Sequence, residues 1–132
     1  MKEIITVDTF DFSEQDYIIC HIHGKEKEFF FVRDVLYCIC EGNYITIFLN
    51  KGEEMLDREL LKTYDEYLFQ YGFFRISHNT IVNGRYITAI DLKNKEKKCF
   101  LGEIELTISR RRVKLLEKSK LFLPLIAKKD HL

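Results

Sequence analysis

The sequence predicts a mainly β fold built from antiparallel sheets, with one or two short helices. Apolar and polar residues alternate with a period of two along most of the chain, which is typical of strands with one buried face. Eleven Phe and seven Tyr beside one Pro and six Gly favour many packed strands, because aromatic side chains fit a pleated, half-buried surface. Closely spaced turn signals indicate hairpins, so neighbouring strands should run antiparallel.

Five alternating segments define the expected strands. Their apolar sets, in chain order, are Ile18, Cys20 and Ile22; Leu36, Cys38 and Cys40; Ile45, Ile47 and Leu49; Tyr86, Thr88, Ile90 and Leu92; and Ile104, Leu106 and Ile108. The turns that separate the alternating segments are expected at residues 23–25, 41–43, 50–52, 83–84 and 101–102, each of which contains a glycine.

Two segments follow a helical period instead. After Asp57, a candidate N-cap, the spacing predicts a short helix over residues 58–69 that lies on the sheet. Ser109 is a candidate N-cap for a second helix that reaches Ser119 and turns Val113 and Leu116 inward. The chain contains no internal repeat and no linker, so we expect one domain from its 132 residues.

The composition excludes several protein classes. The first ten residues carry acids where a secretory signal needs a basic stretch, and no segment approaches the ~20 apolar residues of a membrane span. We therefore expect a cytoplasmic protein, in which the four Cys are reduced and serve as small apolar residues. No cofactor and no small-molecule substrate is indicated.

The net charge of zero conceals a separation of charge along the chain. Residues 1–70 hold 7 Lys and Arg against 15 Asp and Glu, whereas residues 71–132 hold 14 against 6. The second half is therefore the part in which a polyanionic partner would bind. Two solvated faces that attract one another would give the same pattern.

Two polar segments follow apolar strands in this cationic half. In FFRISHNTIVN, residues 73–83, apolar residues anchor both ends and leave Ser77, His78, Asn79 and Thr80 as a loop suited to phosphates and base edges. A turn in which these side chains bond their own backbone is the alternative. Further on, residues 109–112 read Ser-Arg-Arg-Arg, and three cations in the first turn of a helix oppose its dipole unless an anion binds there.

The order of these features resembles the LytTR DNA-binding domain. The resemblance rests on a Gly-Asn-Tyr turn between two strands (36–49), a Leu-rich helix (58–69), the segment 73–83 followed by Ile87, and a strand that ends in Ser-Arg-Arg (104–111). It implies an elongated β architecture that inserts loops into successive major grooves on one side of the duplex. It also implies a bacterial transcription regulator, often placed behind a receiver domain in two-component signalling.

The resemblance assigns site residues position by position. Base reading falls on Asn43, His78, Asn79 and Arg111. Phosphate contact and positioning fall on Tyr44, Ser77, Ser109, Arg110, Arg112 and Lys114. The expected organisation is an N-terminal strand extension (1–27), the DNA-binding domain (28–120) and a C-terminal tail (121–132). Because the chain is less basic than most DNA-binding domains, we expect two copies to bind a direct repeat.

Three alternatives compete with DNA binding. The strand with Phe29, Phe30 and Phe31 cannot bury all three rings on one side, which would suit a β-class protein-interaction module without DNA binding. The segments 20–23 and 38–40 bring Cys and His close in sequence, but neither has the spacing of a structural zinc site, so no metal is expected. An enzyme has the least support, because no motif for nucleophilic or metal catalysis occurs.

Overall fold

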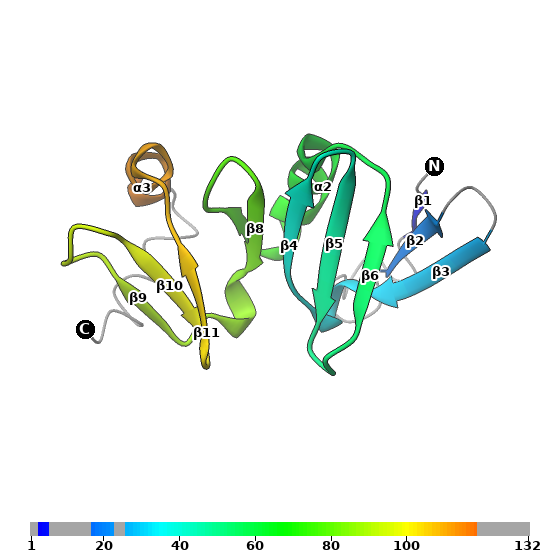
Figure 1. Ribbon diagram of the computed structural model, residues 1–132, viewed down its shortest axis with the longest axis horizontal. Coiled ribbons are helices and arrows are strands. Elements are labelled where there is room, and N and C mark those ends of the chain that lie inside the picture. Colours follow the sequence, from blue (N-terminus) through cyan, green and yellow to red (C-terminus); the bar gives the residue numbers. More distant parts are fainter. Residues whose placement is uncertain (1–2, 6–16, 23–25, 119–132) are drawn as a thin grey trace.

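The computed structural model describes residues 3–5, 17–22 and 26–118, with side chains from Phe31 onward. The three sheets lie side by side along the long axis of the molecule (Figure 1). The first contains β1 (Glu3–Ile5), β2 (Tyr17–Ile22) and β3 (Glu26–Phe31). The second, in the order β6-β5-β4-β8-β7, contains β4 (Val35–Glu41), β5 (Tyr44–Leu49), β6 (Glu54–Asp57), β7 (Phe73–Arg75) and β8 (Thr80–Asn83). The third contains β9 (Ala89–Asp91), β10 (Lys98–Leu101) and β11 (Ile104–Thr107).

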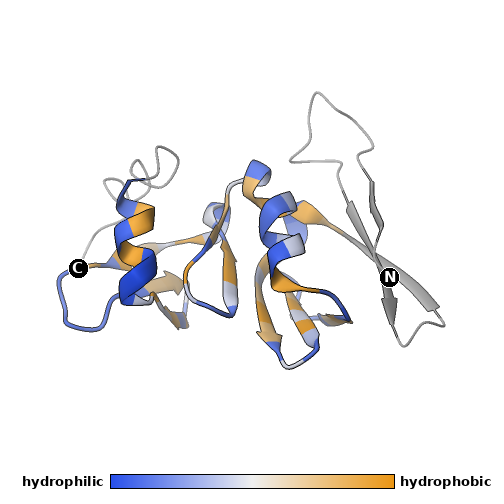
Figure 2. Cartoon of the chain, turned by 90° about the horizontal axis from the view of Figure 1, so that it is seen from above, coloured by the Kyte–Doolittle hydropathy of each residue, from blue (hydrophilic) through white to orange (hydrophobic). Residues whose placement is uncertain are grey.

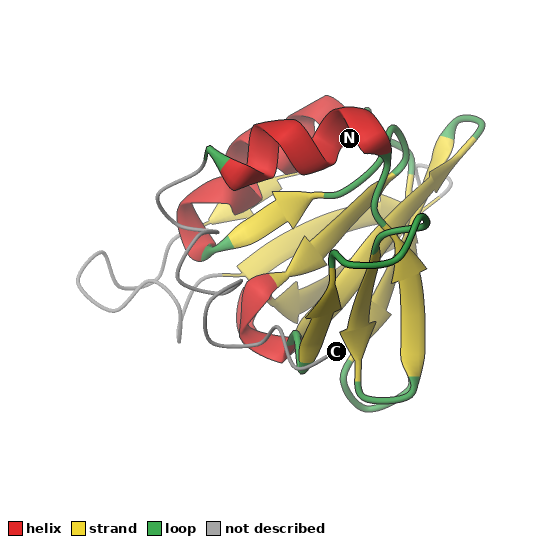
Figure 3. Ribbon diagram, turned by 90° about the vertical axis from the view of Figure 1, so that its left-hand side faces the viewer, coloured by secondary structure: helices red, strands yellow, loops and turns green. Residues whose placement is uncertain are grey.

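Two α helices accompany these sheets in the described part of the chain, α2 (Leu61–Leu68) and α3 (Arg110–Glu117). Short 3-10 helices occupy Val32–Asp34, Phe69–Tyr71 and Gly84–Tyr86. Every strand pairing in the described ranges is antiparallel. Seen along the long axis, both α helices lie at the upper edge with the strands below them (Figure 3). The predicted fold class is confirmed.

The central sheet is buried on both faces where β7 and β8 lie. One face packs under α2 in a core that includes Phe73 and Ile81, and the other packs against the third sheet and α3 in a core that includes Phe74 and Val82. Successive strand residues point to opposite faces, so the adjacent apolar residues of β7 and β8 supply both cores. This explains why the segment 73–83 does not alternate between apolar and polar residues.

The helix expected over residues 58–69 is shorter at its N-terminus than predicted. Its N-cap position is Leu60, which makes no side-chain capping bond. Asp57 instead ends β6, opposite Ile45, and its Oδ2 accepts a hydrogen bond of 2.5 Å from the Tyr64 hydroxyl. The prediction of Asp57 as the N-cap is therefore wrong, because its carboxylate is 1% exposed and bonds a side chain one turn into the helix.

A bulge changes the face assignment of β4. The register with β5 shifts between Val35 and Tyr37, so Val35 joins Cys38 and Cys40 on the side of α2. Leu36 belongs to neither core, and its predicted place beside Cys38 is wrong. The bulge inserts one residue, which reverses the alternation on one side of it.

The strand expected over residues 86–92 is also shorter than predicted. Tyr86 lies in a 3-10 helix that Asn83 caps, with Oδ1 of Asn83 accepting from the Arg85 amide at 3.0 Å. The Tyr86 hydroxyl donates to the carbonyl of Arg33 at 2.6 Å, which joins this segment to the start of the central sheet. By contrast, the predicted alternation at Ile104, Leu106 and Ile108 is confirmed, because Glu105 and Thr107 are the exposed residues of that segment.

The three cysteines whose side chains the structure describes, Cys38, Cys40 and Cys99, are free thiols. Cys38 and Cys99 are fully buried, as expected of small apolar residues. The face assigned to Ile18, Cys20 and Ile22 lies outside the described side chains. No helix within the described ranges is long and apolar enough to cross a bilayer.

Candidate nucleic-acid interface

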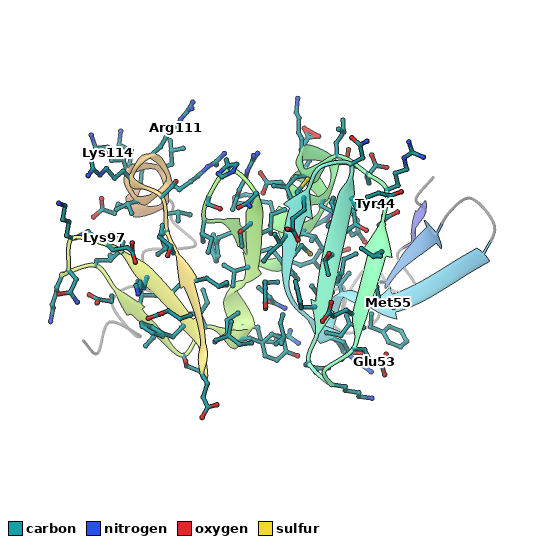
Figure 4. All side chains as sticks on the ribbon, in the orientation of Figure 1. Tyr44, Glu53, Met55, Lys97, Arg111 and Lys114 are labelled. Carbon is teal, nitrogen blue, oxygen red and sulfur yellow. The ribbon has the colours of Figure 1, made fainter. Side chains whose placement is uncertain are left out.

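Three polar turns lie along the upper edge of the molecule. They are the β4–β5 turn with Asn43, the β7–β8 loop with His78, and the first turn of α3 with Arg111 (Figure 1). All three side chains are exposed. Figure 4 shows Tyr44 and Arg111 on this same edge, with Glu53 at the opposite one. The arrangement that a common binding edge requires is therefore present.

The first turn is a tight hairpin. Glu41 pairs with Tyr44, so only Gly42 and Asn43 form the loop, and Gly42 has a φ of 60°. A two-residue hairpin of this kind needs positive φ, which glycine adopts without strain. Asn43 projects from the end of a paired ribbon, and the ring of Tyr44 is 39% exposed beside it.

Arg58 is a cation near this turn that sequence reasoning missed. It lines a shallow groove together with Asn43 and the residues that lead into α2. The signal was absent from the sequence, because Arg58 is 15 residues away from Asn43 and reaches it only through the pairing of β5 with β6.

The second loop is held by hydrogen bonds from within. Arg75 donates from Nε to the carbonyl of Ser77 at 3.2 Å and from Nη2 to the carbonyl of His78 at 2.6 Å. Oδ1 of Asn79 accepts from the hydroxyls of Ser77 and Thr80, each at 2.9 Å. Oγ of Ser77 also accepts from the amide of Asn79 at 3.4 Å, so the alternative in which a loop side chain bonds its own backbone holds at Ser77. Ser77 and Asn79 are half-buried, whereas His78 is exposed.

Backbone hydrogen bonds join this loop to both other turns. The amide of Cys40, two residues before Gly42, donates to the carbonyl of Asn79 at 2.8 Å. The amide of Ser109 donates to the carbonyl of Ile76 at 2.9 Å. The β7–β8 loop is thus a fixed link between the hairpin turn and the start of α3, so the spacing of the three turns is set by the main chain.

The third turn has the predicted N-cap. Oγ of Ser109 accepts from the amide of Arg112 at 3.3 Å, and Leu116 is buried with Val113 packed beside it. Arg110 and Arg111 are exposed at the positive end of the helix dipole, where a bound anion would reverse an unfavourable interaction. Lys114 is exposed one turn further along the same helix.

Arg112 is in a different environment from its neighbours. It is half-buried, and burial together with the charge of Arg75 lowers the pKa of its guanidinium. Asp65 on α2 is the nearby carboxylate; burial raises its pKa, and Arg75 and Arg112 oppose that rise. Arg112 therefore interacts electrostatically with both Asp65 on α2 and Arg75 at the second turn.

The part of the chain that has described side chains contains no candidate metal site. No three His, Cys, Asp or Glu residues there gather in a way that could hold a metal ion. The candidate ligands in segment 20–23, and the rings of Phe29 and Phe30, lie outside the described side chains. Phe31 is described, and its ring lies 4.9 Å from the guanidinium carbon of Arg33.

Comparisons with known proteins identify the fold and family. A solved structure described as the LytTr DNA-binding domain of a methyl-accepting/DNA response regulator from Bacillus cereus is similar, with a TM-score of 0.66 and 13% sequence identity. The similarity covers 77% of this chain and 94% of that chain. No curated protein sequence matches. The family model described as the LytTr DNA-binding domain matches residues 25–120, and the chain therefore belongs to this family of DNA-binding domains.

Proposed function

We propose that this protein is a bacterial transcription regulator that binds double-stranded DNA sequence-specifically, with its three turns in the major groove. The observation that carries the proposal is the common edge on which Asn43, His78 and Arg111 are exposed. Major-groove edges offer each base pair a distinct set of donors and acceptors, which amide, imidazole and guanidinium groups can match. The family to which the chain belongs supports DNA binding in general.

The side chains divide into readers and supports. Asn43, His78 and Arg111 contact base edges, and Asn79 adds its amide group while its oxygen holds the loop. The supporting side chains bond phosphates or position the side chains that contact bases. They are Tyr44, Ser77, Ser109, Arg110, Arg112 and Lys114. Arg111 grips guanine with two parallel hydrogen bonds, which is the commonest specific contact in the major groove.

The proposal extends to the organisation of the chain. Residues 28–120 form the DNA-binding unit, residues 1–27 a strand extension and residues 121–132 a tail. Two copies occupy a direct repeat, because the cations on one edge of one small domain give modest affinity alone. The protein acts in the cytoplasm, where the bacterial chromosome lies.

Selection of duplexes from a random library by the full chain tests the proposal. One motif should be enriched, and the logarithm of its binding constant should fall linearly with the logarithm of salt concentration. Sedimentation on duplexes with one and two copies of the motif then counts the bound chains. If no duplex is enriched and binding does not depend on salt, the protein-interaction module replaces this proposal.

A further inference from the structure

A cationic groove lies at the end of the molecule, next to the third turn. It separates α3 from the loop between β9 and β10, and the cations along it are Lys95, Lys97, Arg110, Arg111 and Lys114. Glu117 is the carboxylate in the same lining. A second, adjoining groove shares Lys95, Lys97 and Arg110 and adds Glu96. Figure 4 shows Lys97, Lys114 and Arg111 together at this end.

The β9–β10 loop is held in one shape by its own side chains. Oδ1 of Asp91 accepts from the amides of Lys93 at 3.0 Å and Asn94 at 3.3 Å, and Oδ2 accepts from the side chain of Asn94. Nζ of Lys97 donates to the carbonyls of Leu92 and Asn94, both at 2.6 Å. The loop is therefore held in a defined turn by its own hydrogen bonds.

A backbone bond fixes this loop relative to α3. The amide of Ile108, the residue before the Ser109 cap, donates to the carbonyl of Lys97 at 2.9 Å. Seen from above, the loop and α3 both carry hydrophilic residues at the same end of the molecule (Figure 2). Any partner that reaches Arg110 thus also lies beside the loop.

The lysines in and beside the loop differ in whether their ammonium groups have partners within the protein. The ammonium group of Lys97 bonds the two carbonyls within the loop. Nζ of Lys98 forms ion pairs with Glu96 at 3.4 Å and with Glu105 at 3.0 Å. Lys93 and Lys95 are both exposed, and neither ammonium group forms a hydrogen bond or ion pair with a residue whose side chain the structure describes. Of these two, Lys95 lines the groove beside α3, so it is the loop cation that remains there for an external anion.

We propose that the β9–β10 loop is a fourth contact with duplex DNA, in which Lys95 and Arg110 hold a backbone phosphate beyond the third turn. This inference rests on the proposed function and enlarges the proposed DNA-contacting surface on the side of α3. The groove includes Arg111 in its lining, and its cations outnumber its one carboxylate, which suits a phosphodiester strand, while the rest of the lining is apolar. A lysine acts as a point charge, so the contact positions the duplex and carries no sequence information.

Titration of duplex DNA at several salt concentrations tests the inference, with the full chain and the duplex enriched by selection. Lys95→Gln should reduce the slope of log binding constant against log salt by about 0.9, which is about a threefold change in relative affinity over a fourfold range of salt. The loss should be equal for the selected duplex and for a random-sequence duplex. Lys51→Gln removes the same charge from the β5–β6 turn at the opposite edge and should leave the slope unchanged.

Trimming the duplex locates the contact. Shortening it beyond the third-turn site should weaken the wild type more than Lys95→Gln, because the variant keeps only Arg110 of the two side chains that hold this phosphate. If Lys95→Gln behaves as Lys51→Gln while the wild type still binds with a steep salt slope, the fourth contact is wrong and the proposed function stands. If the wild type binds no duplex, the proposed function itself fails, and an acidic protein segment becomes the partner that this groove fits.

Discussion

The guanidinium of Arg75 is bonded to the carbonyl of His78 at 2.6 Å, three residues ahead in the chain. The same guanidinium bonds the carbonyl of Ser77, so a single side chain closes the turn from which His78 projects. Arg75 is half-buried and interacts electrostatically with Asp65 and Arg112. It is a positioning residue of the proposed interface.

Replacing Arg75 should therefore impair specificity more than general affinity. In Arg75→Gln the two carbonyls lose a charged donor worth about 1.5–3 kcal/mol, and the loop gains alternative shapes. Binding to the selected duplex should weaken severalfold more than binding to random duplexes. Arg75→Lys, which keeps the charge without the planar fork, should show the same split. Equal losses on both duplexes would mean that Arg75 acts only through its charge.

Arg111 and Lys114 should differ in the kind of binding they support. Arg111→Ala should remove discrimination at one base position, at a cost of about 1–3 kcal/mol on the selected duplex. Lys114→Ala should weaken binding to all sequences alike and lower the salt slope by about 1. Titrations against every single-base variant of the selected site measure both effects. A uniform loss for Arg111→Ala would assign it to phosphate instead.

The buried pair of Tyr64 and Asp57 should contribute strongly to stability. Oδ1 of Asp57 is buried without a hydrogen-bond partner among the described residues, so the Tyr64 hydroxyl is important to this carboxylate. Tyr64→Phe should lower the free energy of unfolding by about 1.5–3 kcal/mol, measured by urea denaturation. The control is Tyr67→Phe on the same helix, where the hydroxyl meets that of Tyr71 at 2.9 Å in a half-buried position and the loss should be smaller.

Asp91 should make the β9–β10 loop sensitive to acid. The side chain of Asn94 and the amide of Lys93 bond the ionised carboxylate and lower its pKa below the usual value of 3.8. A lowered pKa in the folded state means that the carboxylate stabilises the fold above its ordinary pKa, and that this contribution is lost as pH falls through the folded pKa. Melting temperatures measured between about pH 5 and pH 2 should fall less steeply in Asp91→Asn than in the wild type. Parallel curves would contradict this role.

The fold class was predictable because period-two alternation and turn residues act locally. The errors arose where a non-local contact prevailed. Asp57 is a residue type that is favoured at N-caps, but its carboxylate accepts a hydrogen bond from Tyr64 on the following helix. The bulge in β4 was not visible because Val35 and Leu36 are equally apolar in sequence. In each case, local preference was outweighed by tertiary packing.

The candidate edge was predictable in part. A resemblance in the order of motifs pointed to the turns at Asn43, His78 and Arg111, and these turns do lie on one edge. Arg75 and Lys95 were not singled out, because the role of Arg75 depends on the carbonyls that it reaches and that of Lys95 on the groove that it lines. Neither motif order nor charge content contains that information.

The links between the three turns are main-chain hydrogen bonds, from the amides of Cys40 and Ser109 to carbonyls of the central loop. Every residue type except proline can donate such a bond. Relatives could therefore exchange the side chains at 43, 78 and 111 freely, and so recognise new operators, while the distance between successive readers stayed constant. Proline at position 40 or 109 would remove one of these two hydrogen bonds, and with it a restraint on the spacing of the turns.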